Sequence, residues 1–458
     1  MQTDMGGRIE SLYYSSPVWL QNMLVSALGY RLYLKRYTGR YHQIRALLSE
    51  ARHWTESQRL AYQNERLYEM VRFCKQNVPY YQKLFAEHGL REQDITHIDD
   101  LHKIPVLDKD TLRKDQGNFR AVGSKPYILQ NTSGSTGTPL TLAVDETTYK
   151  MAMALVVDHE EFHGVPFGAR RATFAGRMVQ KSNDLSPPFW RFNRAENQRL
   201  YSSYHLNRDT FPFYRKDLDS FAPLELIGYP SAISDIAGYF ELTETRPQFS
   251  PKAIITNSET LLSWQRERIE NVFQCPVRDY YGTAEYVVFA GQDAEGLYQV
   301  SPTLGITEVH TDERNKLQGD IIATSLTNYC MPLLRYRVGD SATLISESEG
   351  SVQTTFAGIN GRLDDYIETP DGRRIGRIDH IFKGLTGIKE AQVIQETDED
   401  CRILIVKESA ESSLNEHALQ ENFHARIGPE MKLFIEYTSQ IPRAANGKFK
   451  SVVRAVKA

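Results

Sequence analysis

The stretch that decides the expected fold is residues 132–139, which read Thr-Ser-Gly-Ser-Thr-Gly-Thr-Pro. Its glycines let the backbone approach a phosphate group closely because no Cβ is in the way, and its hydroxyls are donors that can also ligate Mg²⁺. The apolar run at 127–129 predicts a strand that leads into this loop. The loop is neither a Walker A sequence, since Gly-Lys-[Ser/Thr] is missing, nor a G-x-G-x-x-G dinucleotide fingerprint. By itself it also fits a flexible surface loop, so the rest of the chain has to decide.

The length and composition of the chain narrow the class of protein. A chain of 458 residues predicts two or three domains. Hydrophobic residues at 41% and charged residues at 24% are typical of a soluble globular protein, and a net charge of −4 gives no sign of a nucleic-acid-binding surface. The four cysteines lie far apart without a C-x-x-C pair. We therefore expect reduced thiols, no disulfide framework and a cytoplasmic location.

The first forty residues carry no pattern of a secretory signal. The segment Val18–Leu34 is apolar, but Gln21, Asn22 and Arg31 interrupt it and it is short for a membrane span, so no transmembrane segment is expected. Two interpretations remain for residues 18–37, whose end is basic. The segment is either a helix on an anionic membrane surface or, as the sequence favours, an amphipathic helix docked on its own protein.

The spacing of apolar residues divides the chain into three regions. Residues 1–120 are expected to form a mainly helical extension packed on the large domain. Residues 121–362 alternate short apolar runs with amphipathic stretches, which predicts strand–helix–strand units and, from Gly319 onward, a second sheet or barrel. Residues 363–458 are expected to form a small α+β unit. The fold class is therefore α/β, with a large N-terminal domain and a small C-terminal one.

Four further motifs carry side chains suited to nucleotide chemistry. Residues 280–285 (Tyr-Tyr-Gly-Thr-Ala-Glu) combine a ring that can stack on a purine, a hydroxyl that can donate to phosphate and a carboxylate that can hold Mg²⁺. The motif at 334–340 ends in a Gly-Asp whose carboxylate can accept from both hydroxyls of a ribose. The motif at 361–367 joins an arginine to two aspartates, and the one at 442–448 presents a lysine on an Asn-Gly turn. Alone, each motif also fits an ordinary strand end or surface turn.

Taken in order, these motifs resemble those of the adenylate-forming (acyl-CoA synthetase-like) superfamily, from about residue 60 to the end of the chain. The motifs Val78–Tyr81 and Ile104–Lys109 look like the phenylacetate–CoA ligase-like family. The N-terminal extension and the stretch Asn257–Leu261 resemble its capsular-polysaccharide-biosynthesis (CapK-like) branch. The resemblance implies a multi-subdomain adenylation domain followed by a small, mobile lid domain.

The resemblance also implies a reaction and its residues. A carboxylate attacks the α-phosphate of ATP, giving an acyl-adenylate and pyrophosphate, with ATP and Mg²⁺ as cofactors. The implied catalytic residues are Lys448, which bridges the substrate carboxylate and the α-phosphate, Thr283, which contacts the α-phosphate, and Glu285, which binds Mg²⁺. The residues implied to bind ATP are Ser133, Gly134, Ser135, Thr136, Gly137, Asn257, Ser258, Glu259, Tyr280, Tyr281, Gly282, Asp340 and Arg362. Among them, Tyr281 is expected to stack on adenine and Asp340 to hold the ribose.

The acid is expected to bind near Tyr204, His205, Gly228 and Tyr229, although His205 fits a structural, hydrogen-bonded histidine equally well. Asp364 matches the superfamily's hinge position, about which the small domain turns between the two half-reactions. The identity of the acid cannot be read from these residues.

Two departures from the superfamily pattern bear on the mechanism. Leu140 stands where many members carry a lysine after the phosphate loop, and residues 355–360 lack the cysteines of a zinc-binding insert, so no structural zinc is expected. The acceptor stays open between CoA, a sugar and an amine, the last two in surface-polysaccharide biosynthesis. The alternatives are a phenylacetate-type aryl-CoA ligase and a non-catalytic nucleotide-binding protein of a polysaccharide pathway. A basic cluster at 373–377 suits either CoA phosphates or an exposed loop.

Overall fold

The computed structural model describes residues 12–131, 140–175, 179–181, 184–203, 205–312, 315–347, 350–362, 367–370, 374–375, 378–382, 385, 387–409, 411–443 and 449–455. The predicted phosphate loop at 132–139, Tyr204, the hinge residue Asp364 and the lysine Lys448 lie outside the described residues. For Arg362 the backbone alone is described.

A nine-stranded sheet forms the centre of the large domain, in the order β14-β10-β9-β8-β7-β6-β3-β5-β4. Its strands are β3 (Arg171–Phe174), β4 (Trp190–Asn193), β5 (Gln198–Tyr201), β6 (Glu225–Gly228), β7 (Ala253–Asn257), β8 (Val277–Gly282), β9 (Phe289–Gln292), β10 (Tyr298–Val300) and β14 (Thr355–Phe356). Strands β5, β3, β6, β7 and β8 run parallel. Parallel neighbours need crossover connections, which is why helices alternate with these strands.

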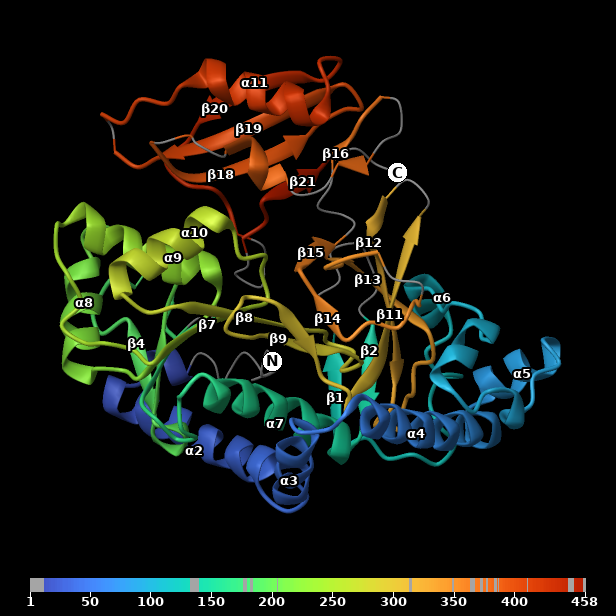
Figure 1. The fold of residues 1–458 in the computed structure, drawn as a ribbon. Helices are drawn as coiled ribbons and strands as arrows, with labels where there is room; N and C mark the ends of the chain where they lie inside the picture. Colours follow the sequence, from blue (N-terminus) through green and yellow to red (C-terminus); the bar gives the residue numbers. More distant parts are fainter. Residues whose placement is uncertain are drawn as a thin grey trace.

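Helices cover both faces of this sheet (Figure 1). They are α7 (Glu146–Phe162) on one face and α8 (Phe211–Phe221), α9 (Pro230–Leu242) and α10 (Ser263–Phe273) toward the other. Strand β6 is buried at all of its positions, as expected for a strand covered on both sides. The α/β fold class predicted from the sequence is confirmed.

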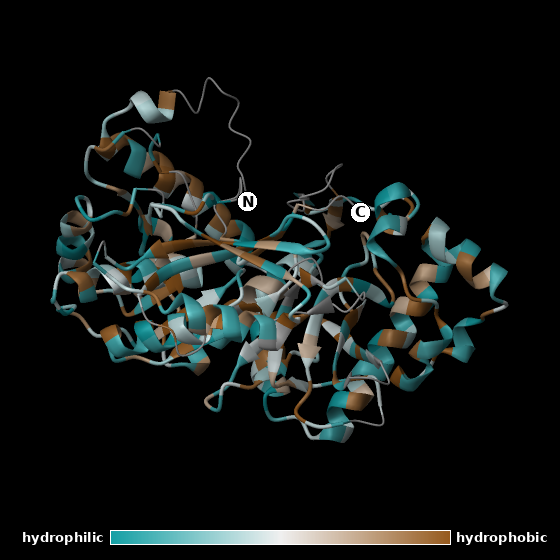
Figure 2. Ribbon diagram, turned by 90° about the horizontal axis from the view of Figure 1, so that it is seen from above, coloured by the Kyte–Doolittle hydropathy of each residue, from teal (hydrophilic) through white to brown (hydrophobic). Residues whose placement is uncertain are grey.

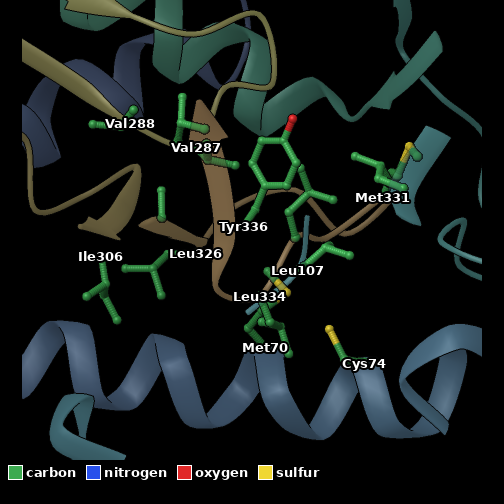
Figure 3. Packing of buried hydrophobic residues seen from close by; sticks show 14 of the residues in the cluster. Met70, Cys74, Leu107, Val287, Val288, Ile306, Leu326, Met331, Leu334 and Tyr336 are labelled. Carbon is green, nitrogen blue, oxygen red and sulfur yellow. The ribbon is translucent and has the colours of Figure 1, made fainter. Parts of the chain in front are cut away.

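A second, antiparallel sheet lies beside the first, in the order β11-β12-β13-β15. Its strands are β11 (Gly305–Asp312), β12 (Asn315–Ser325), β13 (Tyr336–Thr343) and β15 (Gly358–Arg362), and a separate hairpin of β1 (Ile128–Asn131) and β2 (Thr141–Val144) flanks residues 132–139. Figure 3 shows Met70 and Cys74 of α4 (Glu56–Asn77) pointing into the core toward Leu334 and Leu107. In the same view the hydroxyl of Tyr336 points away from α4.

The N-terminal helices wrap the large domain at two places. Helices α2 (Val18–Tyr37) and α3 (Tyr41–Ala51) pack near β4 and α7, whereas α4 and α5 (Pro79–Glu87) lie beside the second sheet (Figure 1). The chain breaks between α4 and α5 at Pro79, because proline lacks the N–H that would continue α4 and is tolerated as the first residue of α5. Short elements then lead to the sheet: η1 (Glu92–Asp94), η2 (Ile98–Lys103) and α6 (Lys109–Lys114).

The C-terminal domain is a small α+β unit that lies above the large domain in Figure 1. Its elements are β16 (Ile367–Glu368), β17 (Arg374–Ile375), η4 (Ile378–Phe382), β18 (Ile388–Gln395), β19 (Asp400–Lys407), α11 (Glu416–Ile427), β20 (Lys432–Tyr437) and β21 (Val452–Arg454). A four-stranded sheet, β20-β19-β18-β21, packs its apolar side against α11 through Ile403, Leu419 and Phe423. Hydrophobic and hydrophilic residues interleave along the helices (Figure 2), as expected for helices that bury one face.

The four cysteines are buried and free. None of the helices that the structure describes has the length and apolar character needed to cross a membrane. Over the same residues, no group of three or more His, Cys, Asp or Glu side chains is arranged to hold a metal ion.

Candidate active site

The end of strand β8 brings two predicted site residues together. The hydroxyl of Tyr281 donates to Oδ2 of Asp340 at 2.5 Å, which joins β8 to β13. Because successive side chains of a strand point to opposite faces, Tyr280 lies on the other side of the sheet. There its ring stacks on Phe289, with 5.4 Å between the ring centroids, and meets the edge of His159. The structure therefore separates Tyr280 from Tyr281, and Tyr280 belongs to the core under α7.

The two residues after this strand that were predicted to be catalytic differ in their surroundings. Oγ1 of Thr283 is buried and has no hydrogen-bond partner among the described residues. An unpaired buried hydroxyl costs about 1–3 kcal/mol, so such a group is typical of a site that awaits a ligand. The carboxylate of Glu285 is buried, and its Oε1 accepts from the hydroxyl of Tyr336 at 3.0 Å and from Nζ of Lys109 at 3.1 Å.

Lys109 reaches this carboxylate because the chain before α6 is bound to β13. Leu107 pairs with the strand through two backbone hydrogen bonds of 2.9 Å, to the carbonyl of Arg335 and from the N–H of Arg337. The buried guanidinium of Arg335 donates to the carbonyl of Ile104 at 2.7 Å and pairs with Glu308 at 2.9 Å. This anchoring fixes where α6 begins and so directs its first residue toward Glu285.

Asp108 occupies the N-cap position of α6, but no capping hydrogen bond forms. Its carboxylate pairs instead with Arg337 at 2.9 Å. Asp108 therefore stands at the N-cap, but its carboxylate is engaged by a charged strand residue. Sequence reasoning missed Lys109 and Tyr336 as site residues. The motif Ile104–Lys109 was the available signal for the first of them.

The direction of the Asp340 side chain depends on an irregularity in strand β13. Asp340 pairs with Arg362 of β15, and the register shifts between Asp340 and Ser341. Gly339, with φ of +94°, precedes it in a conformation that favours glycine. Bulges of this kind turn a side chain out of the ordinary alternation and are frequent next to active sites.

The residues predicted to line the acid pocket have different surroundings in the structure. Gly228 ends β6 so close to its neighbour that a Cβ there would lie 1.9 Å from the carbonyl oxygen of Phe174, which only glycine permits. Tyr229 follows as the N-cap of α9. In contrast, both ring nitrogens of His205 are engaged: Nδ1 with the hydroxyl of Ser202 at 2.7 Å and Nε2 with the carbonyl of Lys181 at 2.9 Å. The geometry favours the structural interpretation of His205.

The loop after β7 meets the C-terminal domain. Oε1 of Glu259 accepts from the backbone N–H of Phe449 at 2.7 Å, and Oε2 accepts from the N–H of Ser231 at 3.3 Å. Burial raises the pKa of Glu259, although these hydrogen bonds act in the opposite direction. The neighbouring Asn257 and Ser258 are bonded to each other at 2.8 Å. Glu259 therefore fixes the residue that directly follows Lys448.

A cluster of charged residues joins the domains beside this point. Arg443 pairs with Glu390 of β18 at 2.5 Å and lies 3.7 Å from Asp235 of α9. Burial, followed by the charge of Asp235, raises the pKa of Glu390 to about 7, and burial raises the pKa of Asp235 as well. Lys389 approaches the hydroxyl of Tyr239 at 3.4 Å. These contacts depend on the position of the small domain.

Comparison with known proteins finds chains that are similar in sequence and in fold. Residues 367–455 match the model of the CapK C-terminal domain. The chain is 28% identical over 454 residues to Protein CapK of Staphylococcus aureus, covering 97% of this chain and 99% of that protein. It is 25% identical over 329 residues to the phenylacetate-coenzyme A ligase of Aromatoleum evansii, covering 67% of this chain and 71% of the ligase. A crystal structure of 2-hydroxyisobutyryl-CoA ligase in the postadenylation state has the same fold, with a TM-score of 0.64, 17% identity and coverage of 87% of this chain and 90% of that one.

The chain is therefore a homologue of CapK over nearly its whole length and of phenylacetate–CoA ligases over 67% of it, and it has the fold of an acyl-CoA ligase. The resemblance drawn from the sequence motifs is confirmed.

Proposed function

We propose that the chain activates a carboxylic acid with ATP to an acyl-adenylate and then transfers the acyl group to an acceptor. The observation that carries the proposal is a pair of buried polar groups that follow β8 in the chain. The hydroxyl of Thr283 has no partner in the described part of the chain, and the carboxylate of Glu285 is buried two residues later. A hydroxyl suits a phosphate oxygen and a carboxylate suits a divalent cation. The homology to CapK and to phenylacetate–CoA ligases supports the same assignment.

The reaction has two half-reactions. In the first, a carboxylate oxygen of the acid attacks the α-phosphorus, and the bond to the leaving pyrophosphate breaks. In the second, the acceptor attacks the acyl carbon and AMP leaves. Because two anions meet in the first step, charge neutralisation and orientation lower its barrier most.

Each site residue has one role in this proposed scheme. Thr283 donates to an α-phosphate oxygen, and Tyr281 stacks on adenine. Asp340 accepts from the ribose hydroxyls, which its carboxylate can do while it binds the Tyr281 hydroxyl, because an ionised carboxylate has about four acceptor positions. Lys448 neutralises the meeting anions, and the bond between Phe449 and Glu259 supports its approach to the large domain.

Magnesium fits the residues present at this site. One carboxylate, that of Glu285, would hold the ion, which suits Mg²⁺ because it usually takes one or two protein carboxylates and completes its shell with phosphate oxygens and water. The absence of a three-ligand cluster in the described ranges agrees with this way of binding. The ion would neutralise charge on the phosphates.

Lys109 supplies a cation that the phosphate loop lacks. Leu140, where many superfamily members carry a lysine, is fully buried here and leaves no cation at that position. The ammonium of Lys109 lies at the Glu285 carboxylate instead. We assign it to the pyrophosphate side of the reaction, where it would exchange part of its contact with Glu285 for phosphate oxygens.

The acceptor is a small nucleophile, and the relatives favour two kinds. Homology to CapK over the full length favours a sugar or amine acceptor in surface-polysaccharide biosynthesis. The homology to phenylacetate–CoA ligases over 67% of the chain favours CoA as the second candidate. The need for ATP favours the cytoplasm in both cases.

Trapping with hydroxylamine tests the proposal, since it converts an acyl-adenylate to an acyl hydroxamate and AMP. We expect one class among aryl, fatty, amino and sugar acids to give hydroxamate with ATP and Mg²⁺. The Lys448→Ala variant should give none, whereas Lys450→Ala, a charge-matched change at an exposed side chain, should retain the activity. ATP binding without hydroxamate from any acid would overturn the proposal in favour of a nucleotide-binding protein.

A further inference from the structure

Helix α2 presents an apolar stripe to solvent. Trp19, Met23, Tyr30 and Leu34 are 64%, 59%, 59% and 46% exposed. Their spacing of four, seven and four residues places them on one face of the helix. A contiguous apolar surface of this kind marks an interaction site more often than scattered single residues do.

The face of α2 that docks on strand β4 is polar. Asn22 accepts from the backbone N–H of Phe192 at 2.9 Å, and Ser26 donates to the carbonyl of the same residue at 3.1 Å. Gln21 accepts from Arg191 at 2.5 Å, and the helix approaches Asn193 so closely at Gly29 that a Cβ would lie 2.0 Å from Oδ1. Strand β4 is the edge of the nine-stranded sheet, so these contacts shield an exposed strand edge.

A surface helix usually docks through its apolar face, whereas α2 docks on β4 through a polar face. Its polar and small residues hold it on β4, Tyr33 and Tyr37 near its end pack into an apolar cluster, and Trp19, Met23, Tyr30 and Leu34 face outward. The helix was expected either to dock on its own protein or to lie on a membrane, and the structure shows that it docks without using the stripe of Trp19, Met23, Tyr30 and Leu34. Folding of the described chain does not use the outward face, which is free for a second contact.

The charge around the stripe points to an anionic partner. No aspartate or glutamate occurs between residues 12 and 49, whereas this range holds Arg31, Lys35, Arg36, Arg40 and Arg45. The acids that reach these helices from elsewhere are neutralised, since Glu196 pairs with Arg36 and Asp158 and Glu161 pair with Arg45. Arg31 and Arg40 are exposed.

We propose that the outward face of α2 binds the surface of a bilayer containing anionic lipid. The helix would lie parallel to the surface, with its apolar stripe among the upper acyl chains and Arg31 and Arg40 at the headgroups. Tryptophan and tyrosine suit this depth because each has an apolar ring and a polar atom. Helices α2 and α3 lie on the side of the molecule remote from the C-terminal domain (Figure 1), so this contact leaves that domain free to move.

Vesicle sedimentation with the full chain tests the proposal. We expect the protein to sediment with an equimolar mixture of phosphatidylcholine and phosphatidylglycerol, and much less with phosphatidylcholine alone. The variant Trp19→Glu with Met23→Glu should lose binding by about tenfold or more, because two apolar side chains no longer enter the bilayer. Phe434→Glu, an exposed apolar residue on β20 of the other domain, is the matched control and should bind like the parent.

Fluorescence and measurements of the molecular mass in solution distinguish vesicle binding from the other possible outcomes. Trp19 is the exposed tryptophan among the described residues, so anionic vesicles should shift the emission to shorter wavelength, and added salt should weaken this shift. Unchanged circular dichroism of the double variant would show that it folds. Absence of sedimentation with anionic vesicles, or equal sedimentation of the double variant, would overturn the proposal. A dimer that the double variant loses, without vesicle binding, would assign the stripe to a second copy of the chain instead.

Discussion

Two regions of the molecule carry its proposed chemistry, and they are assembled in different ways. At the end of β8 every described contact comes from the large domain, including those of Glu285 with Lys109 and Tyr336. At Glu259 the decisive contact crosses from the small domain, through the N–H of Phe449. Arg443 and Asp235 span the same boundary at 3.7 Å.

This difference predicts a separate function for each of the two regions. Under the proposed function, the first region keeps its geometry wherever the small domain lies, so we expect it to bind the nucleotide in both half-reactions. The second forms only when the small domain is docked, and it brings the chain next to Lys448 to the large domain. Nucleotide binding and adenylation should therefore respond separately to mutation.

Removing the lysine that the small domain delivers should have the largest effect. We expect Lys448→Ala to lower the rate of adenylate formation by about a thousandfold or more, because the meeting anions lose their neutralising charge. Affinity for ATP, measured by calorimetry, should stay within about twofold, since the region at β8 is intact. A variant that loses ATP binding to the same degree as activity would remove the distinction between the two regions.

Removing the cation from the first region should have an intermediate effect. We expect Lys109→Met to lower kcat for adenylation by about ten- to a hundredfold, because one charge near the phosphates is lost. Lys114→Met, at an exposed position on the same helix, is the matched control and should leave kcat unchanged. Equal activity of the two variants would refute the role assigned to Lys109.

Raising the pH should weaken docking of the small domain by a smaller amount. The pKa of Glu390 is about 7 in the docked structure, because of burial and the charge of Asp235. Docking therefore binds a proton to Glu390, is favoured fully below the ordinary pKa of a glutamate, and is lost progressively as the pH rises through about 7. The other charged groups that face Glu390 are Arg443 and Lys389.

Energy transfer between labels on Lys252→Cys and Asp398→Cys, both at exposed positions, can measure this docking, since the native cysteines are buried. We expect the docked fraction to fall as the pH rises from about 5 toward the Glu390 pKa of about 7. Glu390→Gln should flatten this dependence. A dependence that persists unchanged in Glu390→Gln would mean that another group controls docking.

The smallest effect is expected at the Tyr281 hydroxyl. Tyr281→Phe keeps the ring for stacking and removes the hydrogen bond to Asp340, which is worth about 1 kcal/mol, or about fivefold in affinity. We expect KM for ATP to rise by this factor with kcat unchanged. A fall in kcat without a change in KM would show that the hydroxyl acts in the chemical step and not in binding.

The sequence motifs placed Tyr281 and Asp340 in one candidate site although they are far apart in the sequence. The structure brings the two side chains into contact because Tyr281 lies near the end of β8, whereas Asp340 lies on β13 of the antiparallel sheet beside it. The same reasoning could not tell Tyr280 from Tyr281, because that choice depends on the face each side chain takes in the pleat.

Other features depend on contacts that no local pattern records. Lys109 meets Glu285 only because Arg335 anchors the chain before α6. His205 is engaged by the carbonyl of Lys181, a backbone group that carries no sequence signal. The apolar spacing of α2 predicted a helix correctly, but it could not reveal that the polar side docks and the apolar side faces outward.

The central claim, activation of an acid by adenylation, is tested most directly by ATP–pyrophosphate exchange. Labelled pyrophosphate can enter ATP only if the first half-reaction is reversible on the enzyme. The account predicts exchange that depends on one class of acid, persists in Lys450→Ala and disappears in Lys448→Ala. Exchange that proceeds undiminished in Lys448→Ala, or its absence with every acid while ATP binds, would contradict it.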